Sequence, residues 1–345
     1  MHIALVSDAW FPQINGVVRT LARVKQELEA IGHEVSVVSP DLFRNFPCPT
    51  YPEIRLALTG PRALERFIDV NGVEAIHIAT EGPLGWAARR LCVRRGWPFT
   101  TSFHTRFPEY IEARAGIPPS WLYAVLRRFH APASAVMVAT ESIYQDLDSR
   151  GFRNLRRWSR GVDTELFKPG GDPPYEAERP IFINVGRVAV EKNIEAFLDL
   201  DLPGSKIVVG DGPLLEKLRS RYPEVLFTGA KTGEELASHY AAADVFVFPS
   251  RTDTFGLVLL EALASGLPVA AFPVPGPLDV INGSPVGVLD EDLSAAAVRA
   301  LEIPRASCRD YALGFSWRAC AEQFLSYLDS FDRKTIRRRP SRKAA

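Results

Sequence analysis

The segment that decides the fold spans residues 181–193 and reads IFINVGRVAVEKN. It opens with a short apolar run, residues 181–185, of the kind that lies buried inside a parallel sheet. Gly186 and Arg187 follow that run directly, and Lys192 comes a few positions later. The pattern predicts two cations in a loop at the carboxyl end of a strand, beside the start of the next helix. Cations and free backbone N–H groups together suit a diphosphate, although a solvated basic turn is the alternative.

The pattern of strands and helices continues on both sides of this segment. In the second half of the chain, apolar runs lie at residues 181–185, 207–209, 225–227, 245–248 and 269–271. Segments with helical spacing fall between them, at residues 191–200, 214–221, 234–241 and 257–264. In the first half, strands are predicted at 3–6, 35–38, 75–78, 99–103 and 135–139, with a helix over 17–31. This alternation predicts parallel sheets that are covered by helices on both faces.

A stretch without periodicity at residues 168–180, rich in Pro and Gly, separates the two halves. We therefore predict an α/β fold of two facing Rossmann-like domains, residues 1–167 and 181–315, joined by this linker. Ligands of such sheets bind at the carboxyl ends of the strands, so the active site is expected in the cleft between the domains. A helix over residues 316–332 is predicted to cross back to the first domain, ahead of a basic, disordered tail at 333–345.

Length and composition restrict the class of protein. The 345 residues exceed the size at which a single core stops growing, which also favours two domains. Because 41 Lys and Arg balance 41 Asp and Glu, bulk charge indicates no nucleic-acid partner. Four scattered cysteines without metal-like spacing indicate reduced thiols. No signal peptide opens the chain and no apolar run is long enough to span a membrane, so we expect a cytoplasmic protein that can sit on the inner face of a membrane.

A second segment with chemical character spans residues 249–261 and reads PSRTDTFGLVLLE. Asp253 precedes the predicted helix, and Glu261 lies about one turn inside it. Carboxylates at these two places suit the hydroxyls of a sugar and of a ribose. Between them the start of the helix forms an anion site. The residues of that site are Phe255, Gly256, Leu257 and Val258. The alternatives are a simple N-cap for Asp253 and a solvent-facing helix residue for Glu261.

Together with Gly16, within INGVV at residues 14–18, these segments resemble the retaining glycosyltransferases of the B-type (GT-B) fold. The closest branch is family four, which contains α-mannosyltransferases and glycolipid-forming glucosyl-, glucuronosyl- and sulfoquinovosyltransferases. The resemblance extends from Ser7 to about Phe331. The segment around Gly16 does not contain the further glycines of the dinucleotide-binding fingerprint, which argues against NAD or FAD as a cofactor.

The resemblance implies a role for each matching residue. Asp253 and Glu261 match the family's carboxylate pair, of which the first contacts the donor sugar and the second the ribose hydroxyls. Asp stands here where many members have Glu, which shortens the reach by one methylene. Arg187 and Lys192 match the pair that binds the diphosphate, and Gly16 matches a glycine loop near the donor phosphates.

The resemblance assigns three further places at strand ends. His104 matches a histidine that points toward the reacting sugar. Residues 210–213, Gly-Asp-Gly-Pro, match a family turn, and Lys231 belongs to the loop 229–231 beside the nucleobase. The implied catalytic residues are therefore His104, Asp253, Arg187 and Lys192, with Gly186 and Lys231 in donor binding. The implied chemistry is front-face attack with retention of configuration, in which the cations stabilise the leaving diphosphate without a metal or other cofactor.

The acceptor is expected on the first domain, at Asp8 and Trp10 beside Gly16. The segment 118–129 combines aromatic and basic residues that suit a membrane interface, and the basic run at 333–343 adds attraction to anionic lipids. A packed surface helix and a solubilising tail are the alternatives.

These observations favour transfer of a hexose or hexuronic acid from UDP-glucose or UDP-glucuronate to a membrane lipid such as diacylglycerol. The alternative is a GDP-mannose-dependent α-mannosyltransferase that acts on a lipid or glycan. A sugar-nucleotide epimerase of the same fold is disfavoured by the spacings of Arg187 with Lys192 and of Asp253 with Glu261. A non-enzymatic binding protein is disfavoured because His104 and the donor-binding residues are all present.

Overall fold

The structure is a computed structural model that describes residues 1–13, 15–48, 51–104, 108, 118–253, 255–281 and 283–331, with the backbone alone at 48, 51–54 and 69–71. The chain divides into two compact units. The first contains Met1–Ser159 and Arg318–Ala345, and the second contains Arg160–Trp317. The predicted boundary at residues 167/168 therefore lies inside the second unit. The predicted tail at 333–345 lies outside the described residues.

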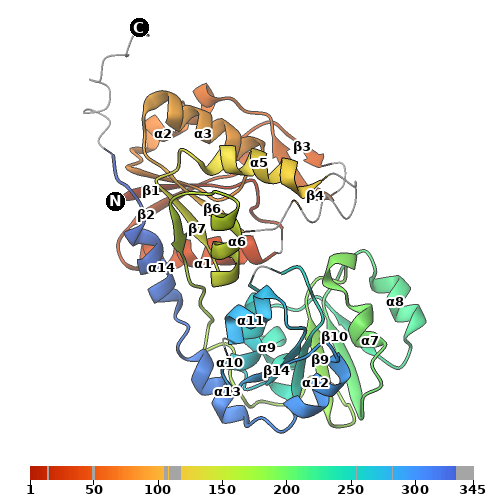
Figure 1. Ribbon diagram of the computed structural model, residues 1–345. Helices are drawn as coiled ribbons and strands as arrows, with labels where there is room; N and C mark the ends of the chain where they lie inside the picture. The colour runs from red at the N-terminus through yellow and green to blue at the C-terminus, as the bar shows by residue number, and fades with distance from the viewer. Residues whose placement is uncertain are drawn as a thin grey trace. The chain divides into compact units, whose positions relative to one another are not determined.

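A six-stranded parallel sheet with the order β2-β1-β5-β6-β7-β8 forms the centre of the first unit (Figure 1). Its strands are β1 (His2–Val6), β2 (Glu34–Val38), β5 (Ala75–Ile78), β6 (Thr100–Phe103), β7 (Ala135–Val138) and β8 (Leu155–Arg157). An antiparallel hairpin of β3 (Asn45–Cys48) and β4 (Tyr51–Ala57) lies between β2 and β5 in the chain. The sequence pattern predicts the first five strands of the sheet closely, whereas it indicates neither β8 nor the hairpin.

Helices cover both faces of this sheet. Figure 1 shows α2, α3 and α5 on one side and α1 and α14 on the other. Among the described residues of this unit, the helices are α1 (Gly16–Ala30), α2 (Pro61–Asn71), α3 (Pro83–Arg95), α5 (Pro119–His130), α6 (Glu141–Ser149) and α14 (Trp317–Ser326), with a short 3₁₀ turn η1 (Pro40–Leu42). Because both faces are covered, β1 is buried along its whole length, which explains the uninterrupted apolar run at residues 3–6.

The closing helix is shorter than the sequence predicts. Helix α14 ends at Ser326, whereas the helical spacing predicts an end near residue 332. Beyond the helix, the N–H of Phe331 donates to the carbonyl of Glu74 (2.8 Å), and the Phe331 ring stacks on Trp97 with the ring centres 5.3 Å apart. The apolar residue at 331 is therefore explained by its packing on the first unit and not by a continued helix.

The second unit holds another six-stranded parallel sheet, with the order β11-β10-β9-β12-β13-β14. Its strands are β9 (Ile181–Val185), β10 (Ser205–Val209), β11 (Leu226–Gly229), β12 (Val245–Phe248), β13 (Val269–Ala271) and β14 (Gly287–Leu289). In chain order this is 3-2-1-4-5-6, the strand order of the dinucleotide-binding Rossmann fold. The predicted fold class, two Rossmann-like α/β domains, is confirmed.

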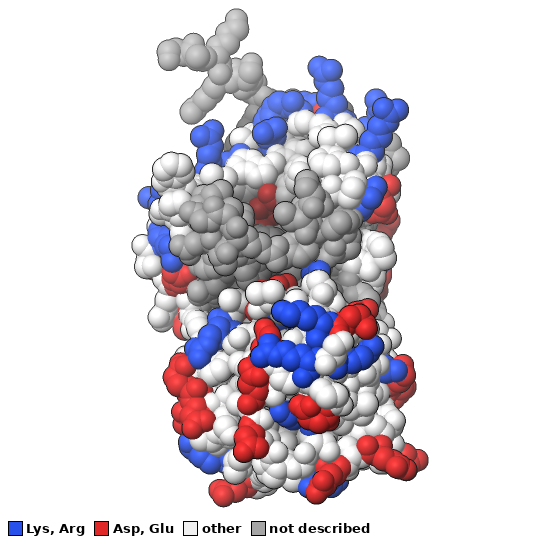
Figure 2. All heavy atoms as spheres, turned by 90° about the vertical axis from the view of Figure 1, so that its right-hand side faces the viewer, with Lys and Arg blue, Asp and Glu red and all other residues white. Residues whose placement is uncertain are grey.

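The helices of the second unit are η2 (Val190–Lys192), α7 (Glu195–Leu198), α8 (Leu215–Arg221), α9 (Gly233–Ala242), α10 (Leu257–Ala264), α11 (Pro275–Ile281), α12 (Leu293–Ala300) and α13 (Arg305–Ala312). Figure 2 shows the face that carries α7 and α8, where basic and acidic side chains are interspersed. Arg221 pairs with Glu195 between the two helices (2.7 Å). On α7 and α8, basic side chains therefore have acidic neighbours.

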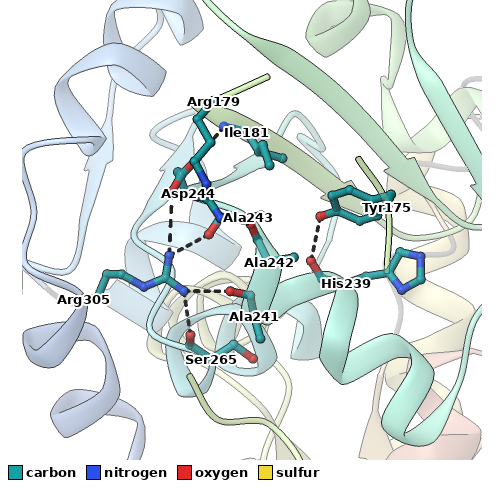
Figure 3. Close-up of polar contacts among 10 residues, drawn as sticks. All are labelled: Tyr175, Arg179, Ile181, His239, Ala241, Ala242, Ala243, Asp244, Ser265 and Arg305. Atoms are coloured by element: carbon teal, nitrogen blue, oxygen red, sulfur yellow. Dashed lines mark hydrogen bonds and ion pairs between the residues drawn. The ribbon is translucent and has the colours of Figure 1, made fainter. Parts of the chain in front are cut away.

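The predicted linker, residues 168–180, is irregular and is held against the C-terminal end of α9 (Figure 3). The Tyr175 hydroxyl donates to the carbonyl of His239 (3.1 Å), and Arg179 donates to the carbonyl of Ala242 (2.9 Å). Arg305 of α13 donates to Ala243 (2.6 Å), Ala241 (3.1 Å) and Ser265 (3.3 Å). These arginines satisfy the last carbonyl groups of α9, which have no partner within the helix.

Candidate active site

The sheet of the second unit reverses its order between β9 and β12. Two neighbouring strands from which the chain departs in opposite directions leave a crevice at their carboxyl ends, and ligands of open α/β sheets bind there. The loop after β9 begins at Gly186, and the loop after β12 begins at Pro249. These are the two segments in which the sequence places the donor-binding residues.

An ion pair joins the two loops. Lys192 Nζ donates to Asp253 Oδ1 at 2.5 Å, with 31% of the Lys192 side chain and 17% of the Asp253 side chain exposed. The other carboxylate oxygen, Asp253 Oδ2, is buried and accepts no hydrogen bond from any residue within the described parts of the chain. A buried acceptor without a donor is costly, so this oxygen is well suited to a ligand hydroxyl.

Asn193 gives the loop after β9 its shape. The residue is left-handed (φ 52°), and its side chain donates to the carbonyl of Pro249 in the loop after β12 (3.0 Å). In the opposite direction, the Thr252 hydroxyl donates to the carbonyl of Glu191 (3.1 Å). The prediction of one helix over residues 191–200 is wrong for this reason, because the left-handed turn at Asn193 separates η2 from α7. Lys192 therefore lies at a turn that these two hydrogen bonds attach to the loop after β12.

Two glycines allow the turn after β10 to pack directly against the loop after β9. A Cβ atom on Gly210 would lie 1.8 Å from the carbonyl oxygen of Gly186, and one on Gly212 would lie 2.3 Å from that of Val188. The N–H of Val188 donates to the carbonyl of Asp211 (2.9 Å). The Gly-Asp-Gly sequence thus supports the backbone that presents Arg187, whose side chain is exposed.

Helix α10 carries the second carboxylate. Its N-cap is Gly256, which is left-handed (φ 81°) and makes no side-chain cap, so the alternative of a simple Asp253 N-cap is wrong. Glu261 is only 8% exposed, which excludes a solvent-facing residue, and Glu261 Oε2 accepts a hydrogen bond from the Tyr240 hydroxyl at 3.0 Å. Phe255 is buried, whereas Leu257 and Val258 are half-buried at the start of the helix.

Lys231 lies two residues beyond β11 at the same edge of the sheet. Its Nζ donates to Glu235 Oε1 in the first turn of α9 (2.5 Å). The shared hydrogen bond lowers the pKa of the exposed Glu235 carboxyl. The side chain of Lys231 is therefore directed along α9.

In the first unit, Asp8 is a helix cap. It is 6% exposed and lies just after β1. Its carboxylate accepts hydrogen bonds from the N–H groups of Leu84 (2.9 Å) and Gly85 (3.2 Å) at the start of α3, and from the Thr80 hydroxyl (3.0 Å). Burial outweighs these hydrogen bonds and raises the pKa of Asp8. The predicted acceptor-binding role of Asp8 stays a prediction, and its observed contacts position α3.

Three further predicted residues lie on loops of the first unit. Trp10 is half-buried, with its ring edge-on to Phe11 at 5.4 Å. Gly16 opens α1, and a Cβ atom there would have no neighbour within 4 Å among the described residues. His104 follows β6 directly, half-buried, with its ring 5.8 Å from that of Trp158. Residues 14 and 254 of the quoted motifs, and residue 105 directly after His104, lie outside the described residues.

Within the described ranges, no group of three or more His, Cys, Asp or Glu side chains has the arrangement of a metal site. The metal-independent reaction stays a prediction. Among the same residues, no helix has the length and apolarity that crossing a membrane requires.

Comparison with solved structures agrees with the architecture. The chain superposes on sucrose-phosphate synthase from Thermosynechococcus elongatus with a TM-score of 0.79, at 23% identity, over 94% of this chain and 97% of that one. The protein therefore has the two-domain GT-B fold of glycosyltransferases.

Family models and relatives define the class further. Residues 14–166 match the model for glycosyltransferase family 4, and residues 179–303 match the model for glycosyl transferases group 1. A GDP-mannose-dependent alpha-mannosyltransferase of Mycolicibacterium smegmatis is 32% identical, over 84% of each chain. An alpha-monoglucosyldiacylglycerol synthase of Streptococcus pneumoniae is 30% identical, over 87% of this chain and 78% of its own length. A sulfoquinovosyl transferase of Arabidopsis thaliana is 34% identical over 81% of this chain, which spans 61% of that protein. The chain belongs to glycosyltransferase family 4 and is a glycosyltransferase.

Proposed function

We propose that this glycosyltransferase moves a hexose or hexuronic acid from a nucleotide sugar to a membrane lipid, with retention of configuration. The observation that supports the donor assignment best is the Lys192–Asp253 pair at the switch point of the second sheet. Lys192 would lie against the diphosphate, and the buried Asp253 Oδ2 would accept a sugar hydroxyl. Arg187, exposed on the same loop, would add the second cation that stabilises the leaving group.

A basic surface on the first unit supports a lipid acceptor. Helix α3 is tied to the end of α5 by Arg89, which donates to the carbonyls of Phe129 (2.8 Å) and Arg128 (2.7 Å). Exposed arginines gather on α2, α3 and α5, and Figure 2 shows basic side chains at that end of the unit with few acidic ones among them. They are Arg62, Arg66, Arg90, Arg94, Arg95, Arg127 and Arg128. We call this set the arginine surface.

Apolar side chains accompany the arginine surface. Trp121 is 73% exposed and Val125 is 51% exposed, one helical turn apart on α5, and Val93 of α3 is 51% exposed. Exposed aromatic and aliphatic side chains beside arginines suit the interface of an anionic bilayer. The basic run at residues 333–343 would add to this attraction. The Streptococcus relative is named for a diacylglycerol product, which supports the same acceptor class.

We favour UDP-glucose or UDP-glucuronate with diacylglycerol as acceptor. The second candidate is GDP-mannose, because a relative of nearly equal identity is named for that donor.

The deciding experiment measures donor consumption across UDP-glucose, UDP-glucuronate and GDP-mannose, each with and without vesicles that contain diacylglycerol. Lipid-dependent consumption of a UDP-sugar is the expected result. Consumption of GDP-mannose alone would replace the proposed donor. Consumption that is equal with and without vesicles would refute the lipid acceptor.

A further inference from the structure

Glu261 is held by a residue that the sequence motifs do not include. Tyr240 lies near the end of α9 and is completely buried, and its hydroxyl donates to Glu261 Oε2 at 3.0 Å. The Tyr240 ring packs edge-on against the ring of Phe167, with the ring centres 5.7 Å apart. Its centre lies 5.8 Å from that of the Phe246 ring of β12. The phenol of Tyr240 is therefore held between α9, which carries it, and α10, which carries Glu261.

The rest of α10 is also fixed to this region. Arg309 of α13 donates to the carbonyl of Ala264 at the end of α10 (2.9 Å) and to the carbonyl of Phe167 (2.7 Å). One guanidinium therefore holds both the backbone of Phe167, whose ring contacts Tyr240, and the end of the helix that carries Glu261. A side chain whose neighbours are locked in this way keeps one orientation.

We infer that Tyr240 is a positioning residue that orients the Glu261 carboxylate for the two ribose hydroxyls of the nucleotide donor and so sets the preference for a ribonucleotide. The inference rests on the proposed function, in which Glu261 contacts the ribose. A carboxylate has about four acceptor positions, and one phenolic O–H occupies only one of them. A carboxylate that is already fixed loses little conformational freedom when the nucleotide binds. A hydrogen bond from a second ribose hydroxyl therefore adds more to the binding affinity.

The test measures binding of the nucleoside diphosphate and of its 2′-deoxy and 3′-deoxy analogues by calorimetry. UDP is used, or GDP where the donor panel selects GDP-mannose. For the wild-type protein we expect at least one deoxy analogue to bind roughly tenfold more weakly, since it leaves a hydrogen bond to a charged group unmade. Tyr240→Phe is expected to bind the ribonucleotide roughly fivefold to tenfold more weakly and to lose most of this discrimination.

Tyr222→Phe is the matched control. Tyr222 also donates to a carboxylate, Asp199 Oδ1 at 2.5 Å, in the same unit and at no residue assigned to the donor. We expect this variant to keep the wild-type discrimination. A purely structural role of Tyr240 would lower the melting temperature of Tyr240→Phe and leave the ratio of ribose to deoxyribose affinities unchanged, which would overturn the inference.

Glu261→Gln separates this inference from the proposed function. Loss of discrimination in Glu261→Gln with full discrimination in Tyr240→Phe refutes the role of Tyr240 and leaves the ribose contact standing. Unchanged discrimination in Glu261→Gln refutes the ribose contact, and the inference with it. Glu261→Asp provides a second variant, because the shorter side chain cannot reach both the phenol and the ribose. Full discrimination in Glu261→Asp would also count against the inference.

Discussion

Lys192 and Asp253 form an ion pair across the switch point of the second sheet, although 60 positions in the chain lie between them. The pair connects the loop after β9 with the loop after β12 and directs the buried Asp253 Oδ2 to a place without a donor among the described residues. A ligand that places a diphosphate beside Lys192 and a hydroxyl beside Asp253 Oδ2 would pair a negative charge with the lysine and supply a hydrogen-bond donor to the aspartate.

Lys192→Ala is expected to lower turnover by at least ~10²-fold, because it removes a charge that stabilises the leaving diphosphate. The substitution also removes the partner of Asp253 Oδ1 on a largely buried carboxylate, so we expect a loss of roughly 1–3 kcal/mol in the free energy of unfolding. Steady-state kinetics and denaturant unfolding measure the two effects separately. Lys217→Ala, on α8, is the control. Wild-type turnover in Lys192→Ala would remove Lys192 from the donor site.

Gly16→Ala and Gly210→Ala should have different effects on stability and on donor binding. The structure leaves room for a Cβ atom at Gly16, in the first turn of α1, so alanine there should keep or slightly raise the melting temperature. If donor phosphates approach Gly16, the same methyl group will weaken donor binding. Gly210→Ala places its Cβ atom against the Gly186 carbonyl and should lower both stability and activity. A Gly16→Ala protein with wild-type donor affinity would remove Gly16 from the phosphate site.

The sequence predicts the parts of the site that depend on local patterns. Strand β9 and helix α10 have the predicted bounds, because an uninterrupted apolar run and a glycine before a helix are local signals. The break at Asn193 is not local, since its side chain is held by the carbonyl of Pro249, far along the chain. A periodic pattern of apolar residues cannot show such a contact.

Other features of the molecule have no distinctive signal in the sequence. Tyr240 reads as one more apolar position of an amphipathic helix, and only its contact with Glu261 shows its polar function. Asp8 reads as a polar residue after a strand, yet it caps a helix 76 positions away in the chain. The arginine surface is assembled from three helices, so the segment 118–129 alone indicates only part of it.

Asp8→Asn tests the electrostatics of that cap. Burial raises the pKa of Asp8 in the folded protein, so the fold binds the Asp8 proton more tightly than the unfolded chain does. Its contribution to the free energy of unfolding is then fully present below the ordinary pKa of aspartate, and is lost as pH rises through the raised pKa. The wild-type protein should therefore lose stability relative to Asp8→Asn as pH rises above about 4, the ordinary pKa of aspartate. Denaturant unfolding of both proteins across this range measures the difference. A relative gain of the wild type as pH rises would show that the hydrogen bonds outweigh burial.

Charge reversal on the arginine surface tests the membrane proposal. Arg90, Arg94 and Arg128 are exposed on α3 and α5. Each basic residue near an anionic bilayer contributes about 1 kcal/mol, so Arg90→Glu, Arg94→Glu and Arg128→Glu together should weaken vesicle binding by at least ~10²-fold. Deletion of residues 333–345 should weaken it further and leave the melting temperature unchanged.

The matched control reverses Lys217, Arg219 and Arg221 on α8, where acidic neighbours are interspersed. The net charge changes equally in the two triple variants, so a general effect of charge would weaken vesicle binding equally in both. Binding is measured by flotation with anionic and with neutral vesicles, at low and high salt. Because salt screens surface charges, the difference between the triple variants should shrink as ionic strength rises. Equal loss in both variants, or an unchanged arginine variant, would show that α3 and α5 do not face the lipid, and the acceptor would then have to be sought away from a bilayer.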